Sequence, residues 1–135
     1  MKIRTTECPL PVSSAFAGIL EAEIGKANLS DGIGAIVSFR SPDYSPETGG
    51  YHPVEVAVDG KGRLVYVTDF AFVGQPPFHD LAKEIDFDFS LGLFQHFGVE
   101  HPLTIGKGLF ALWQSNFVAY HRNGIYTVHV EPARW

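Results

Sequence analysis

YHPVEVAVDGKGRLVYVTDFAF, residues 51–72, has the pattern of a β-hairpin. Both arms alternate apolar and polar residues, and the apolar positions are Val54, Val56, Val58, Val65 and Val67. The DGKG segment between the arms, residues 59–62, suits a tight turn, because glycine adopts positive φ without a steric penalty. A period of two is typical of a strand with one buried face. The sequence therefore predicts two antiparallel strands joined at 59–62.

The register of this hairpin brings a histidine and a carboxylate together. If residues 59 and 62 pair across the turn, Val54 lies opposite Val67, and His52 lies opposite Asp69. A charge-assisted hydrogen bond between these side chains would either tie down the open end of the hairpin or orient the imidazole as a general base. Both interpretations are open, and a longer turn would shift the register and remove the pair.

The chain has the length and composition of one soluble globular domain, residues 1–135. Apolar residues make up 45% and charged residues 19%, and the length suffices for a single core. The formal net charge of −5, with lysines and arginines scattered singly, argues against a nucleic-acid surface.

The sequence also bears on location. No run approaches the ~20 apolar residues that cross a bilayer. The first apolar run is interrupted by prolines and serines, so we expect no secretory leader. Cys8 is the only cysteine, which excludes an intramolecular disulfide and suits a reducing compartment. We expect a cytoplasmic protein with no membrane or nucleic-acid partner.

The first element is predicted to be an amphipathic helix from an N-cap at Ser13 to about Asn28. Its apolar residues fall on one side, and they are Phe16, Ile19, Leu20, Ile24 and Ala27. Glu23 projects onto the middle of this apolar stripe. Its carboxylate either reaches past its neighbours to water or lines a cavity, which makes Glu23 a candidate ligand-binding residue.

A strand predicted at 35–40 leads into a long loop, SPDYSPETGG at 41–50. Most connections have ~4–6 residues, and longer ordered ones often carry function. Tyr44 in this loop is therefore a second ligand-binding candidate. The glycine pair at 49–50 lacks the lysine-serine or helix start of a phosphate-binding loop, and we expect no cofactor.

After the prolines at 76–77, residues 78–85 are predicted to form a short helix. Its buried side would carry Phe78, Leu81, Ala82 and Ile85. Beyond it the pattern alternates, which places Asp86 and Asp88 on one face of an extended segment. These carboxylates either bind a divalent cation or form the solvated side of a strand, and they lack the further oxygen ligands of a calcium site. Residues 91–101 are expected to be a packed loop or a short helical turn.

The last helix is predicted to follow a cap at Thr104 and to run over 109–120. Its apolar band comprises Leu109, Leu112, Trp113, Phe117 and Tyr120. Asn116 falls at the centre of this band, where its amide either bonds to backbone groups or faces a polar cavity. It is a further ligand-binding candidate. A final strand is predicted at 125–130.

Four separated segments resemble a known family. They are FRSPDYSPETGGYHPVEV at 39–56, VYVTDF at 65–70 with a valine-glycine pair at 73–74, LAKEIDFDF at 81–89, and LWQSNF at 112–117. From about residue 36 to 128 the chain is thus similar to a small bacterial family of uncharacterised proteins, domain of unknown function 2787. The resemblance implies a compact α+β fold similar to the cystatin-like roll, and it implies no activity, ligand or partner.

Independently of the resemblance, the order of elements predicts an α+β fold with a curved antiparallel sheet of about four strands packed by helices on one face. Helices lying across such a sheet could bring Glu23, Asn116 and the His52–Asp69 pair to one concave site.

Two functions of different class fit these residues. The first is a non-catalytic binding or interaction module that receives a small molecule, a peptide or a second copy of the chain. It rests on aromatics at 13% of residues and on the absence of a complete catalytic motif. The second is a small enzyme for proton transfer or hydrolysis, with His52 as general base, Asp69 orienting it, and Asn116 or Tyr44 as hydrogen-bond donor.

Overall fold

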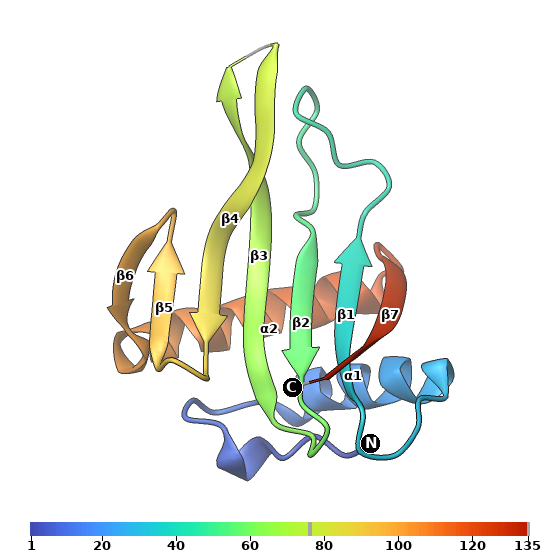
Figure 1. Cartoon of the computed structure of the whole chain (residues 1–135). Coiled ribbons are helices and arrows are strands. Elements are labelled where there is room, and N and C mark those ends of the chain that lie inside the picture. The colour runs from blue at the N-terminus through green and yellow to red at the C-terminus, as the bar shows by residue number, and fades with distance from the viewer. Residues whose placement is uncertain (76, 135) are drawn as a thin grey trace.

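The computed structural model describes residues 1–75 and 77–134, and it shows one open antiparallel sheet covered on one face by two helices (Figure 1). The strand order is β6-β5-β4-β3-β2-β1-β7. The α-helices are α1 (Ser14–Ala27) and α2 (Lys107–Arg122), the short 3₁₀ helices are η1 (Thr5–Glu7) and η2 (Leu103–Gly106), and the strands are β1 (Gly34–Arg40), β2 (Val54–Val58), β3 (Leu64–Gln75), β4 (Phe78–Asp88), β5 (Leu93–His96), β6 (Val99–Pro102) and β7 (Thr127–Ala133).

The α+β class is confirmed, and the expectation of about four strands is wrong, because the sheet has seven. The additional strands lie between residues 78 and 102, where the sequence predicted a helix and a loop. Here β4 pairs with β3 along nearly its whole length, from Tyr66↔Asp88 to Gln75↔Phe78. Cross-strand pairing therefore overrides the helical spacing of the apolar residues in 78–85. Residues 91–101 likewise contribute to a β5–β6 hairpin.

The central hairpin forms, but its register differs from the predicted one by two residues. Val54 lies opposite Asp69, and Val56 lies opposite Val67. The loop is longer than expected, since the Asp59 N–H donates to the Arg63 carbonyl, and the register shifts again between Ala57 and Val58. A shift by two keeps each side chain on its own face, so Val54, Val56, Val58 and Val67 all lie in the core. Beyond the irregularity, Leu64 pairs with Val58 and takes the core position predicted for Val65, which is only half-buried.

Both helices bury their apolar sides on the same face of the sheet. The N-cap prediction for α1 is confirmed, because the Ser13 hydroxyl accepts a hydrogen bond from Phe16 N–H, 3.1 Å away. Phe16 then packs edge-on against Trp113 and Phe117 of α2, with ring centroids 5.5 Å apart in each case. Such edge-to-face contacts are the favoured geometry of aromatic pairs.

The phase of α2 differs from the predicted one. Its buried side chains are Phe110, Trp113, Gln114, Phe117 and Val118. Leu112 is exposed, and so is Asn116, because the helix is rotated relative to the predicted band. The predicted cap at Thr104 is also wrong: Gly106 precedes α2, and no side chain caps it. The buried amide of this helix is Gln114.

The β3–β4 hairpin extends beyond the rest of the sheet as a two-stranded ribbon, seen at the top of Figure 1. β2 begins at Val54, opposite Asp69, and β5 ends at His96, opposite Ile85. Among the strands of residues 1–75 and 77–134, none other than β3 and β4 therefore runs along this ribbon, which is defined here as residues 71–75 and 78–82. Neither α-helix in the described part of the chain is long and apolar enough to cross a membrane.

Candidate functional site

A pocket of about 460 Å³ opens between α2 and the segment that leads into β2. Its walls are largely aromatic, from Tyr51, Trp113, Phe117, Tyr120 and Tyr126. These rings pack on one another, and the centroids of Tyr51 and Tyr120 lie 4.7 Å apart. A volume of this size with apolar walls and a few polar groups is typical of small-molecule sites.

A larger hollow of about 750 Å³ lies between the N-terminal segment, the end of α1 and the hairpin loop. Glycines, charged residues such as Lys2 and Asp31, and aliphatic residues such as Ile24 and Leu29 line it, and no aromatic side chain contributes to its wall. Its size alone does not make it a binding site, since specific pockets combine apolar walls with convergent polar groups.

His52 and Asp69 form the polar end of the aromatic pocket. The His52 Nδ1 lies 2.9 Å from Asp69 Oδ1, and the indole N–H of Trp113 donates to Asp69 Oδ2 at 3.1 Å. The predicted contact therefore exists, although the two residues are not directly opposed. His52 precedes β2, and it reaches Asp69 diagonally from the end of the strand. Both carboxylate oxygens of Asp69 are held in place.

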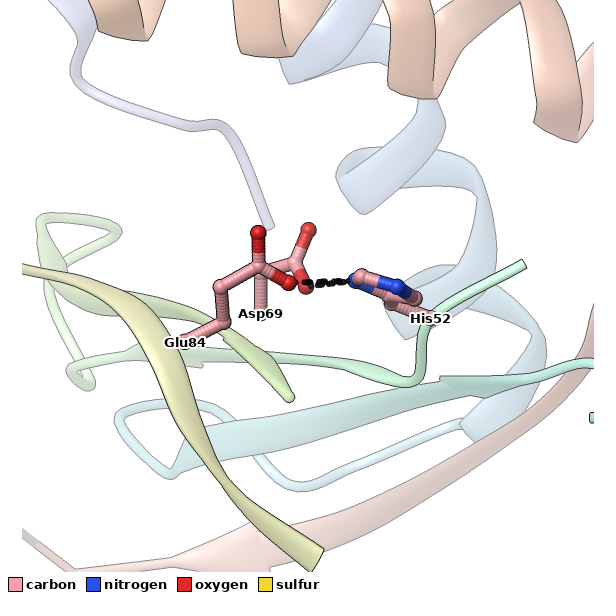
Figure 2. A group of neighbouring side chains, drawn as sticks. All are labelled: His52, Asp69 and Glu84. Atoms are coloured by element: carbon pink, nitrogen blue, oxygen red, sulfur yellow. Dashed lines mark hydrogen bonds and ion pairs between the residues drawn. The ribbon is translucent and has the colours of Figure 1, made fainter. Parts of the chain in front are cut away.

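Glu84 is the third member of this group, a place that the helix predicted for residues 78–85 did not indicate. Its Oε2 lies 2.7 Å from the same Nδ1 of His52, and Figure 2 shows the three side chains converging. Glu84 sits where the β3–β4 register shifts: Asp69 pairs with Ile85 and Phe70 with Lys83, so Glu84 has no partner in β3. A bulge of this kind re-aims a side chain, and it directs Glu84 toward Asp69.

The electrostatics of the group favour a protonated imidazole. The hydrogen bond to Asp69 raises the pKa of His52 above its usual value, and this effect outweighs partial burial, which lowers the pKa. The charges of Asp69 and Glu84 raise it further. Burial and the nearby Asp69 charge also raise the pKa of Tyr126, whose hydroxyl stays protonated at neutral pH.

The remaining ligand-binding candidates lie in different places. Tyr44 packs beside His52, with ring centroids 5.3 Å apart, and its hydroxyl accepts the N–H of Phe72 at 3.0 Å. Asn116 lines the pocket from the exposed side of α2. Glu23 is outside the pocket lining and pairs with Lys26 at 3.2 Å and His121 at 3.5 Å.

The two aspartates proposed for a cation use their carboxylates within the protein. The Thr68 hydroxyl donates to Asp86 at 2.6 Å. Asp88 accepts hydrogen bonds from the backbone N–H groups of Ser90 and Leu91, each at 3.0 Å. Both carboxylates thus have structural partners. In the described part of the chain, the histidine, aspartate and glutamate side chains that could share a metal ion are His52, Asp69 and Glu84.

The chain matches solved bacterial structures along most of its length. It is similar to the hypothetical protein VC0508 from the VSP-II pathogenicity island of Vibrio cholerae, at 31% identity and a TM-score of 0.79, over 92% of this chain and 96% of that one. It is equally similar to the hypothetical protein VC1805 from pathogenicity island VPI-2 of Vibrio cholerae O1 biovar eltor, at 31% identity and a TM-score of 0.79, over 92% and 97%. VC1805 is described as sharing structural homology with the human P32 protein.

A comparison with curated proteins finds no match. A family model does match residues 14–131, which include β2, β3 and α2, the elements that line the pocket. This chain therefore belongs to the family described as Protein of unknown function (DUF2787).

Proposed function

We propose that the protein is a binding module for a small organic molecule, and that the aromatic pocket is its site. The observation that carries this proposal is the combination of aromatic walls with one polar end at His52 and Asp69. The ligand would have a flat apolar body that packs on the rings and one polar group that meets His52 or Asp69. Both solved relatives are called hypothetical proteins, so the proposal rests on the pocket alone.

The walls of the pocket are preorganised for a ligand. Trp113 is largely buried and stacks on Phe117, with ring centroids 5.0 Å apart, so this wall is fixed by the core. The same indole holds Asp69 through its N–H. A preorganised site loses little conformational entropy when the ligand binds.

The proposal includes two finer expectations. We place the module in the cytoplasm, as the single cysteine suggests. We also regard the open sheet with helices on one face as a variant of the cystatin-like roll. The pocket argument depends on neither.

The experiment is a fragment screen by ligand-observed NMR and thermal shift on three proteins: the natural chain, Asn116→Trp and Leu112→Trp. Asn116 lines the pocket, whereas Leu112 is exposed one turn earlier on α2 and lies outside the pocket lining. Fragments that raise the Tm of the natural chain and of L112W, but not of N116W, would support the proposal. Fragments that bind N116W equally well would place the site elsewhere and overturn it.

One observation favours an acid–base function for the same pocket. Because Nδ1 of His52 faces the carboxylates, Nε2 is the nitrogen left for a substrate, and it has no hydrogen-bond partner among the described residues. This orientation is the one in which a carboxylate positions a catalytic imidazole. Turnover of model esters that is lost in His52→Gln but kept in His96→Gln would support catalysis, and turnover equal in all three proteins would contradict it.

A further inference from the structure

We propose that His52, Asp69 and Glu84 bind a divalent transition-metal ion, of which Zn²⁺ is the representative, at the polar end of the aromatic pocket. The three candidate ligand atoms, one from each side chain, all lie within 4.8 Å of one another. They come from three neighbouring segments of the sheet: the residues before β2, the middle of β3, and the bulge in β4. The inference goes beyond the binding of an organic molecule and does not depend on it.

The first argument is that two carboxylate oxygens share a single N–H donor of His52. Nδ1 of His52 can carry one proton, yet two carboxylate oxygens lie 2.9 Å and 2.7 Å from it. The hydrogen bond goes to Asp69, and Glu84 Oε2 is sealed from solvent without a hydrogen-bond partner. Glu84 Oε2 thus has an ion pair with the imidazole but no donor of its own, and a bound cation would compensate its burial.

The second argument is the charge of the group. Two carboxylates and one imidazolium leave a net charge of about −1, by summing the ordinary charges of these side chains. In the described part of the chain, neither Asp69 nor Glu84 forms an ion pair with a lysine or arginine, and nearby Lys83 lies against Asp86 instead. A divalent cation bound to a neutral imidazole would bring the sum to zero.

The ligand set selects the class of ion. An imidazole nitrogen is a common ligand of zinc and other transition metals, whereas calcium takes six to eight oxygens. Three protein ligands with a position left for water or substrate match an open zinc site. With Zn–ligand distances of about 2.0–2.1 Å, tetrahedral ligands are roughly 3.3 Å apart, so each carboxylate oxygen would lie slightly farther from His52 Nδ1 than its present 2.9 Å or 2.7 Å.

The surroundings already hold the ligands in orientation. The Trp113 N–H bond to Asp69 Oδ2 fixes that carboxylate and leaves Oδ1 to face His52 and Glu84. Hydrogen bonds of this kind commonly orient metal-binding side chains. His52 and Asp69 both line the pocket, so the open coordination position would face it.

The experiment is a titration of tag-free, EDTA-treated protein with ZnCl₂ by isothermal calorimetry. We expect one ion per chain, and at least a tenfold weaker affinity in Glu84→Gln, which keeps the shape of the side chain and removes its charge. Two matched controls should bind like the natural protein: Glu100→Gln and His96→Gln, at exposed positions of the β5–β6 hairpin. Trp113→Phe keeps all three ligands, and we expect a loss of up to tenfold.

NMR of the histidine ring nitrogens in the natural protein tests the same site and does not require any variant to fold. Zn²⁺ should shift the Nδ1 resonance of His52, and the shifts should saturate at one equivalent. The inference is overturned if the natural protein binds no stoichiometric Zn²⁺, if the shifted imidazole is not His52, or if folded E84Q binds as tightly as E100Q.

Discussion

Gln114 shows how one side chain can connect two helices. Its Oε1 accepts the Ser13 N–H at 2.8 Å, and its Nε2 donates to the Pro11 carbonyl at 3.1 Å and the Phe110 carbonyl at 3.4 Å. The side chain is buried. It therefore satisfies backbone groups at the start of α1 that would otherwise be left without partners.

We predict that Gln114→Leu lowers the free energy of unfolding by about 1–3 kcal/mol, because it leaves the Ser13 N–H and the Pro11 carbonyl unsatisfied. Urea denaturation measures this change. Asn116→Ala, at an exposed position on the same helix, is the control and should change stability by less than about 0.5 kcal/mol. Equal effects of the two substitutions would contradict the structural role of Gln114.

Asp59 links the stability of the hairpin loop to pH. Burial raises the pKa of its carboxyl, but the backbone N–H and guanidinium of Arg63, together with the N–H of Lys61, outweigh burial and lower it. A carboxyl whose pKa is lower in the folded state stabilises the protein above its unfolded pKa of about 3.9. That contribution is lost as the pH falls through the lower, folded pKa.

We predict that Asp59→Asn makes the free energy of unfolding depend less on pH between about pH 5 and pH 2. The difference should stay below about 1 kcal/mol, since the partner Arg63 is exposed. Urea denaturation at several pH values measures it. Parallel pH profiles for D59N and the natural protein would show that Asp59 titrates alike in both states.

At the scale of elements, the hairpin loop has a glycine at a position where any side chain would be strained. Gly62 has a φ of 87°, and a Cβ at this position would lie 2.1 Å from the Lys2 carbonyl oxygen. The backbone of the loop is also bonded to the N-terminal segment, since Arg4 N–H donates to the Gly62 carbonyl at 2.9 Å. The loop and the N-terminal segment thus hold each other in place.

We predict that Gly62→Ala destabilises the protein by about 2 kcal/mol or more, because alanine is strained at this φ and its Cβ would collide with backbone. Thermal and urea unfolding measure the loss. Gly18→Ala is the matched control: Gly18 lies within α1, and a Cβ there meets no atom within 4 Å. It should stabilise the protein by about 0.5–1 kcal/mol. A neutral G62A would contradict the packing.

Elements with strong local signals could be predicted from the sequence. The serine cap and the 3.6-residue period identify α1, and the alternating valines identify β2 and β3. β4 could not be predicted, because Phe78, Leu81 and Ile85 also fit a helix. Its strand conformation comes from pairing with β3, a contact that local spacing does not encode.

The site was predictable in part for the same reason. His52 and Asp69 flank a recognisable hairpin, and a register shift of two residues left them near each other. Glu84 belongs to β4, where the apolar spacing predicts a helix, and its orientation depends on a bulge that has no sequence signature here. Trp113, Phe117 and Tyr120 of the aromatic wall belong to the apolar band predicted for α2, whereas Tyr51 and Tyr126 lie outside the helices and strands, where no periodic pattern places them.

At the scale of the whole molecule, one apolar core joins the helices to the sheet. It extends from Ile3 near the N-terminus through Phe39 of β1 and Phe87 of β4 to Phe117 of α2. Because these residues come from both ends of the chain, no part of the fold has a core of its own. A small structure of this kind unfolds cooperatively.

We predict that Trp113 fluorescence, measured in a Trp135→Phe variant so that it comes from one tryptophan, and far-UV circular dichroism report the same unfolding midpoint in urea. Trp113 lies between α2 and the sheet, whereas circular dichroism reports all helices and strands. Gln114→Leu should shift both transitions by the same amount. Two separate midpoints would show that the helices and the sheet unfold as different units.

The projecting ribbon has a consequence for motion at the site. An isolated pair of strands is marginally stable in water. Amide hydrogens in 71–75 and 78–82 should therefore exchange with solvent faster than those in residues 64–70 of β3, which have strands on both sides. Glu84 lies at the bulge where this ribbon leaves the sheet. It follows two residues after Ala82, which pairs with Ala71 at the base of the ribbon. Opening that spreads from the ribbon to the bulge would separate Glu84 from Asp69, so a ligand that bridges these two carboxylates would slow deuterium uptake in the part of the ribbon next to the bulge.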